Sequence, residues 1–168
     1  MNGMSEVSGL TGLMQAVTTA GAVGAGVIGG VFFTFSAFVM PALRRLPAVQ
    51  GIGAMQSINK LAVTPPLMLV LFGTAVLSVV TVIWAIRSWS HPVAPWLLAG
   101  GLAYLAAIVI TIVGNVPLNN SLAILDPSAA GAPAQWASFA SRWTIWNLLR
   151  GAGAAAGSVA YIVALLKA

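Results

Sequence analysis

The sequence has 168 residues, of which 60% are hydrophobic and only 5% are charged, and its mean hydropathy is +0.99. Roughly a quarter of the residues in a soluble domain are charged, so water could not wet the surface of this chain and a bilayer is the expected solvent. The net charge of +5 comes from scattered lysines and arginines without a basic tract, so no nucleic-acid partner is expected. Cysteine is absent, which excludes disulfides and thiolate chemistry.

Four apolar runs are each long enough to cross the hydrocarbon core, which takes about 20 helical residues. The strict polar/apolar alternation of a membrane β-barrel is missing from all of them. The sequence therefore predicts an all-α integral membrane four-helix bundle, formed by residues 1–168 as a single membrane domain. The predicted spans cover about residues 13–40, 65–86, 95–114 and 143–166.

Two of the connections are long enough to form helices of their own. The connection after the first span predicts an interfacial helix that carries Gln56, Asn59 and Lys60 on one face. In the last connection, Pro133 is typical of a proline in the first turn of a helix. The fourth helix is therefore predicted to begin well before its span and to extend beyond the bilayer.

Basic residues in short loops predict the orientation in the membrane. The side with the two longer loops carries four of them and the other side carries two. We therefore expect the longer loops in the cytoplasm and both termini outside, which in a bacterial cell means the inner membrane. The four are Arg44, Arg45, Lys60 and Arg142, and the two are Arg87 and Lys167.

Small residues recur at four-residue spacing on the first and fourth helices, where they let helices approach closely in lipid. The stripes favour helix contacts within one chain, and a homo-oligomer through these faces is the alternative. They consist of Ala22, Gly26 and Gly30 on the first helix and of Gly153 and Gly157 on the fourth.

Polar residues gather at one end of the predicted bundle, on the side of the longer loops. Arg150 is the most informative, because an ionisable residue at mid-bilayer costs at least roughly 2.5–3.5 kcal/mol and must face the bundle interior or a wet cavity. The same stripe of the fourth helix carries Trp143, Trp146, Asn147 and Tyr161. On the third helix, Asn115 precedes a proline, Pro117, which is expected to interrupt the helix, and Asn119 follows.

The two carboxylates of the chain limit how Arg150 can be neutralised. Glu6 is expected on the far side of the membrane, and Asp126 lies in a loop. If Asp126 does not reach Arg150, the site suits a ligand that is anionic or becomes so. The alternatives are a guanidinium that bonds helix ends and snorkels to the headgroups, and amides that only join helices. The single histidine, His91, offers no metal cluster, so no metal is expected.

Four segments together resemble the anthrone-oxygenase-like family of small membrane proteins. They are GGVFFTFSAFVMPALRRLP, GIGAMQSINKLAVTP, NVPLNNSLAILDP and WTIWNLLR, in this order and among four spans. Some fungal members oxidise anthrones to anthraquinones with O2 and without an evident metal or flavin. The resemblance therefore implies a cofactor-independent oxygenase, with a lipophilic small molecule and O2 as its partners. Many members carry a histidine where this chain has Leu148.

The resemblance also implies roles for the polar cluster. Arg150 would stabilise an anthrone anion, and Trp143 and Trp146 would stack on its flat rings. Amides would orient its oxygen atoms. The amides are Asn115, Asn119 and Asn147, and the expected substrate-binding residues also include Gln56, Asn59 and Tyr161. The alternative function is a non-catalytic bundle that binds a lipid, a quinone or a partner helix.

Overall fold

The computed structural model describes residues 10–168, and all regular structure in this part of the chain is helical. Glu6, whose position on the far side was an expectation, lies outside the described residues. The helices are α1 (Gly12–Thr34), α2 (Met40–Leu43), α3 (Ala48–Ala62), α4 (Pro65–Arg87), α5 (Ala94–Ile110), α6 (Val116–Ala123) and α7 (Ala132–Leu166). Two π-helical turns lie between helices, η1 (Phe35–Val39) after α1 and η2 (Thr111–Asn115) after α5.

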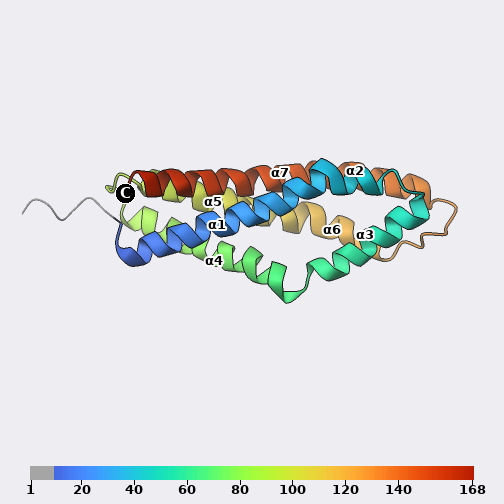
Figure 1. Cartoon of the computed structure of the whole chain (residues 1–168), viewed down its shortest axis with the longest axis horizontal. Helices are drawn as coiled ribbons and strands as arrows, with labels where there is room; N and C mark the ends of the chain where they lie inside the picture. Colours follow the sequence, from blue (N-terminus) through green and yellow to red (C-terminus); the bar gives the residue numbers. More distant parts are fainter. Residues whose placement is uncertain (1–9) are drawn as a thin grey trace, which may run out of the picture.

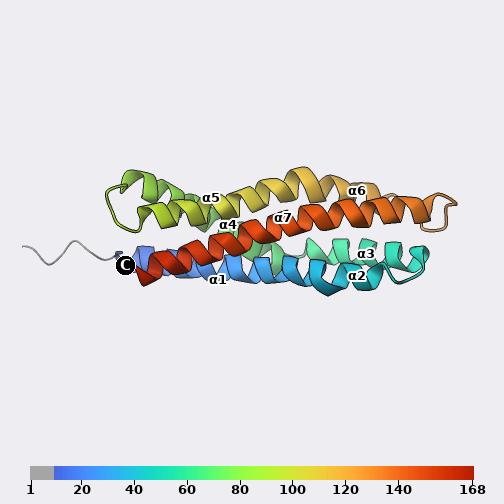
Figure 2. The same ribbon diagram turned by 90° about the horizontal axis from the view of Figure 1, so that it is seen from above.

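These helices form four long columns packed side by side, as Figures 1 and 2 show from two directions. The predicted all-α four-helix bundle is thereby confirmed. Each column contains a helical stretch long and apolar enough to cross a membrane, so the chain is an integral membrane protein. The stretches are Gly12–Leu43, Pro65–Arg87, Ala94–Ala123 and Ala132–Leu166.

The bundle is longer than a bilayer is thick. The 35 residues of α7 span about 52 Å at 1.5 Å per residue, against a hydrocarbon core of about 30 Å. The predicted extension of the fourth helix is therefore present. The α2–α3 turn and the α6–α7 loop lie together at one end of the bundle, and the C-terminus lies at the other (Figure 1).

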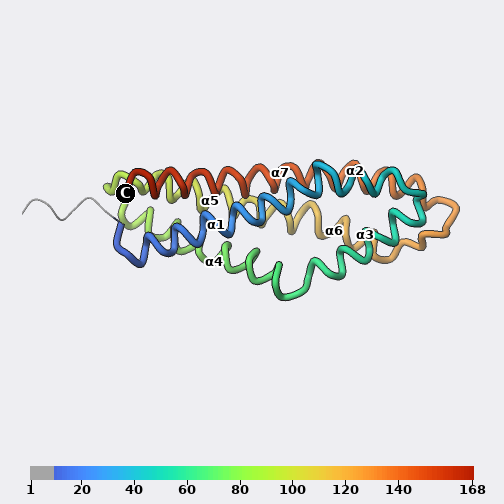
Figure 3. The backbone as a smooth tube through the Cα atoms, in the orientation of Figure 1, coloured from blue at the N-terminus to red at the C-terminus, as the bar shows by residue number. Residues whose placement is uncertain are grey.

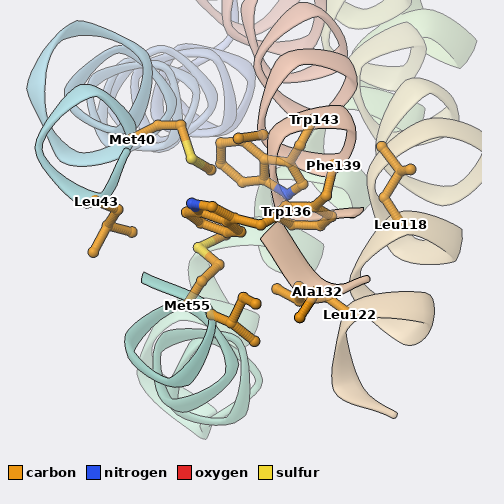
Figure 4. Close-up of a cluster of buried hydrophobic side chains, with 11 residues drawn as sticks. Met40, Leu43, Met55, Leu118, Leu122, Ala132, Trp136, Phe139 and Trp143 are labelled. Carbon is orange, nitrogen blue, oxygen red and sulfur yellow. The ribbon is translucent and has the colours of Figure 1, made fainter. Parts of the chain in front are cut away.

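The helix predicted between the first two spans is α3, and it runs back along the bundle instead of across its end (Figure 2). It buries Ile52 and Met55 in a cluster around Trp136. Figure 4 shows the Trp136 ring between Met55 and Trp143. At Gly51 a Cβ would lie 2.9 Å from the carbonyl oxygen of Leu43, so glycine allows α3 to pack this close to α2.

An elbow separates α3 from α4 and forms the lowest point of the trace in Figure 3. Helix α3 ends at Ala62, and Thr64 is extended. Pro65 and Pro66 then open α4, where their missing N–H groups cost little. The elbow stands away from the other columns, and the cavity described below lies beside it.

Both π-helical turns end two residues before a proline. Turn η1 ends at Val39 before Pro41, and η2 ends at Asn115 before Pro117. A proline in a helix removes one N–H and pushes against the carbonyl four residues earlier, and the wider π-helical turn takes up this conflict. Pro117 was expected to interrupt the third helix, but the helix continues through it as α6.

The small-residue stripes pack helices within the chain. A Cβ on Gly153 would lie 3.0 Å from the carbonyl oxygen of Ala103, and one on Gly157 would lie 3.1 Å from that of Gly100. On α1, a Cβ on Gly26 would lie 3.2 Å from the hydroxyl oxygen of Ser158. Helix α7 therefore approaches α5 and α1 at distances that small residues permit.

The close approach at Gly157 predicts a stability effect. In Gly157→Val the new side chain meets the backbone of α5, which cannot move aside, so we expect a loss of about 1–3 kcal/mol in the free energy of unfolding. Thermal unfolding in detergent, followed by circular dichroism, measures the change. Gly30→Val is the matched control, because a Cβ at Gly30 meets nothing within 4 Å. Equal melting temperatures for the two variants would contradict the packing described here.

Candidate functional site

Arg150 lies inside the bundle, and its side chain is only 8% exposed. Its Nε and Nη2 atoms donate hydrogen bonds to Oδ1 of Asn147 at 3.0 and 2.8 Å. The guanidinium carbon lies 4.0 Å from the centre of the Phe32 ring and 5.3 Å from that of Trp143. The cation is therefore held by one amide oxygen and two aromatic rings, both of which attract it through their π electrons.

Asn147 fixes this arrangement from the other side of its amide. Its Nδ2 donates to the carbonyl oxygen of Phe32 at 2.6 Å and to the hydroxyl of Ser36 at 2.7 Å. Because a guanidinium can only donate, the amide oxygen must face Arg150, and the orientation of the amide follows. Asn147 is fully buried. Its hydrogen bonds tie α7 to the end of α1 and to η1.

Asp126 does not neutralise Arg150. It is exposed in the turn after α6, where its Oδ1 accepts a hydrogen bond from the backbone N–H of Ser128 at 2.8 Å. Asp126 is the only acid among residues 10–168, and within that range Arg150 has only the amide and aromatic partners described above. In the described part of the chain, no group of three or more His, Cys, Asp or Glu side chains gathers as metal ligands.

A cavity of about 310 Å³ lies against Arg150, beside the α3–α4 elbow. Apolar side chains from all four columns form most of its wall. The polar side chains that face it are few and come from different columns. They are Asn59 of α3, Thr111 of η2, Asn119 of α6 and Arg150 of α7.

The cavity reaches the outer surface of the bundle. Val63, Phe72 and Ile112 line it, and they are also 69%, 54% and 56% exposed on the outside. These exposed side chains are apolar. Val63 lies in the elbow, and Phe72 and Ile112 lie in helical stretches that are long and apolar enough to cross a membrane. The opening of the cavity is therefore apolar.

Trp143 forms part of the cavity wall and is held in place at both its ring and its backbone. Its indole Nε1 donates to Oδ1 of Asn119 at 2.8 Å, and its carbonyl oxygen accepts from Nδ2 of Asn115 at 3.2 Å. The Phe35 ring packs against it with 5.8 Å between the ring centres. A rigid aromatic surface therefore lies between Arg150 on one side and Asn119 on the other.

The structure brings most of the predicted site residues together. Arg150, Trp143, Asn119 and Asn59 line the cavity. Asn147 and Asn115 lie behind this wall and hold Arg150 and Trp143 in place.

Three predicted residues lie elsewhere. Gln56 donates to the carbonyl oxygens of Leu122 and Leu125 at 2.8 and 2.9 Å and so holds the end of α6. Trp146 packs against Gly114. The Tyr161 hydroxyl lies 2.9 Å from that of Thr81 and 3.0 Å from that of Ser78, about three helical turns beyond Arg150 along α7. None of the three lines the cavity.

Sequence reasoning did not single out Phe32, whose ring covers the guanidinium and whose carbonyl binds Asn147. It lies in an apolar run where a phenylalanine is expected to face lipid. No pattern in the sequence marks Phe32, because Pro41 affects the carbonyl four residues before it and not the carbonyl of Phe32.

The family model described as anthrone oxygenase matches residues 66–160, which is more than half of the chain. The chain belongs to the anthrone oxygenase family. No curated protein and no solved structure matches it. The matched stretch contains Trp143, Asn147 and Arg150, whereas Phe32 and Asn59, which complete the site from α1 and α3, precede it.

Leu148 of this anthrone oxygenase family member stands at the position where the resemblance described above implies a histidine. Its side chain is 54% exposed on the outer face of α7 and does not line the cavity. A histidine at this position would therefore face away from Arg150. Leu148 is therefore not part of the cavity wall.

The bonds of Asn147 predict that it stabilises the fold. In Asn147→Leu, the guanidinium of Arg150 and the carbonyl of Phe32 lose their partner in a buried place, so we expect a loss of about 1–3 kcal/mol in the free energy of unfolding. Denaturation in mixed micelles measures it. Asn120→Leu on the exposed face of α6 is the matched control, and a loss of similar size in both variants would argue against this role.

Proposed function

We propose that this protein is a cofactor-independent, oxygenase-like membrane enzyme that acts on a lipophilic polycyclic phenol or anthrone with O2. The observation that carries the proposal is Arg150, a buried cation without a carboxylate partner among residues 10–168, at the wall of an apolar cavity with an apolar opening. Membership of the anthrone oxygenase family supports the same reaction.

The electrostatics of the site favour a ligand that becomes negative. A charge in a low-dielectric interior interacts far more strongly than the same charge in water. The Nη1 nitrogen of Arg150 donates no hydrogen bond within residues 10–168, so it remains available to a ligand oxygen. An anthrone that loses the proton of its methylene carbon becomes a delocalised oxyanion, which the guanidinium would stabilise as the charge develops.

The anion is electron-rich enough to react with O2 at the carbon that lost the proton. One anthrone and one O2 then give one anthraquinone and one water. The methylene carbon loses two hydrogens and gains a carbonyl oxygen, a four-electron oxidation, and O2 takes up the four electrons. In this scheme Trp143 supports the flat rings, and Asn147 and Asn115 act as positioning residues.

The proton must leave without a protein base at the cavity. Arg150 is the only ionisable side chain among the residues that line it, and an arginine remains protonated. We therefore assign the proton to water at the mouth of the cavity. Arg150 promotes its loss by stabilising the anion that remains.

This assignment predicts a simple pH dependence. The rate of O2 consumption should rise with pH and level off once the bound anthrone is ionised, because only the anion reacts. Anthrones of different acidity should shift the midpoint of this curve in parallel with their own pKa values. A bell-shaped profile with the same midpoints for every substrate would indicate a protein acid and base and would contradict the assignment.

Replacing the cation tests the proposal itself. Arg150→Met keeps a flexible, unbranched side chain and removes its charge, so we expect O2 consumption with an anthrone to fall by about 10²-fold or more. Arg142→Met is the matched control, because Arg142 is exposed on the same helix. Both variants are first checked for unchanged helix content and size in detergent.

A folded Arg150→Met protein with wild-type O2 consumption would exclude the electrostatic role. If the wild-type protein consumes no O2 with any anthrone offered, the oxygenase proposal fails. The remaining reading would be a non-catalytic bundle that binds a lipid or quinone in the same cavity.

We also propose that the end of the bundle with the longer loops faces the cytoplasm, on the basis of its larger number of basic residues. The chain contains no cysteine, so single cysteines can report the side. In right-side-out vesicles, an impermeant maleimide should label Ser90→Cys in the α4–α5 loop and spare Ser128→Cys in the α6–α7 loop. Both positions are exposed. The reverse labelling pattern would overturn this orientation.

A further inference from the structure

A second polar group, besides Arg150, faces the cavity. Asn59 lines the cavity, and its buried Nδ2 has no hydrogen-bond partner among residues 10–168. A buried amide without a partner costs free energy, and rotating the amide would exchange its two atoms without bringing a protein partner. The side chain therefore needs a partner from the contents of the cavity.

Asn119 lines the same cavity and carries a second amide donor. Its Oδ1 already accepts the indole N–H of Trp143, and its Nδ2 donates no hydrogen bond within the described chain while the residue lines the cavity. The two amides come from α3 and α6, so the folded bundle is needed to bring both to one cavity. Trp143 contacts Asn119 through its indole N–H and the guanidinium of Arg150 at 5.3 Å from its ring centre, so it links Asn119 to the cation.

We propose that Asn59 and Asn119 form a second anchor, which binds a ligand oxygen on the edge of the ring system opposite the oxygen held by Arg150. The preferred ligand is then a flat polycycle with oxygen atoms on two opposite edges. This inference rests on the proposed function, because only that reaction gives the second oxygen atom a role. In that reaction the opposite edge is the one that is oxidised, so the anchor would hold the oxygen that O2 delivers.

Anthraquinone and anthrone test the anchor, because anthraquinone carries carbonyl oxygens on both edges of its central ring and anthrone carries one. Binding is measured without O2, by equilibrium uptake into nanodiscs that contain the protein, after subtraction of uptake by protein-free nanodiscs. One additional hydrogen bond is worth about tenfold in affinity. We therefore expect the wild-type protein to bind anthraquinone about tenfold more tightly than anthrone.

Asn59→Leu removes the amide and keeps a side chain of similar size. We expect it to bring the two affinities to within about threefold of each other and to leave the affinity for anthrone unchanged. Asn120→Leu, exposed on the outer face of α6, should preserve the wild-type ratio. The ligand-free Asn59→Leu protein should melt at the same temperature as the wild type or above it, because it loses an amide that has no partner.

Three results would overturn the anchor. They are an equal affinity of the wild type for both ligands, an equal loss of both affinities in Asn59→Leu, and a lower melting temperature of that variant without ligand. Because these readouts are equilibrium measurements, they do not depend on turnover. A protein that never consumes O2 but shows the predicted ratio would refute the oxygenase proposal and retain the two-edge binding site.

Discussion

The site depends on a guanidinium that is solvated by protein groups instead of by a counter-ion. Arg150 receives one amide oxygen from Asn147 and the faces of two aromatic rings, Phe32 and Trp143. These partners are neutral, so they lower the cost of burial without cancelling the charge. The positive potential remains available in the cavity, where an oxyanion of the proposed substrate would complete the pair. A carboxylate in the same place would pair with the guanidinium and cancel the charge that a ligand could otherwise use.

The two π-helical turns connect the fold to this arrangement. Turn η1 contains Ser36, and the Phe32 carbonyl just before it accepts the Asn147 amide, while η2 ends at Asn115, which binds the backbone of Trp143. Each turn lies just ahead of a proline, which creates the irregularity and ends no helix. The hydrogen bonds of Asn147 and Asn115 therefore connect α7 to the first and third columns next to the two irregular turns.

Much of the architecture follows from the sequence because hydropathy and length decide it. The four spans, the helix before the second span and the long fourth helix all have unambiguous signals in apolar runs and first-turn prolines. The stripe of Trp143, Asn147 and Arg150 is equally readable, since helical periodicity places these residues on one face. Helical periodicity does not show which residues of the other helices face this stripe. Phe32 covers Arg150 because the Phe32 side of α1 packs against α7, and Tyr161 shares the stripe but lies about three turns away among the hydroxyls of α4.

The matched and unmatched parts of the chain build the site together. The family match begins within α4 and contains the cation, Trp143 and the amides that hold them. Phe32 and Asn59, which line the cavity from α1 and α3, precede the match. Asn119, the other amide of the proposed anchor, lies inside the match and lines the same cavity. The elbow between α3 and α4 joins these two parts. Asn59 lies on α3 before the elbow, and the exposed side chains of Val63 in the elbow and Phe72 on α4 line the opening of the cavity.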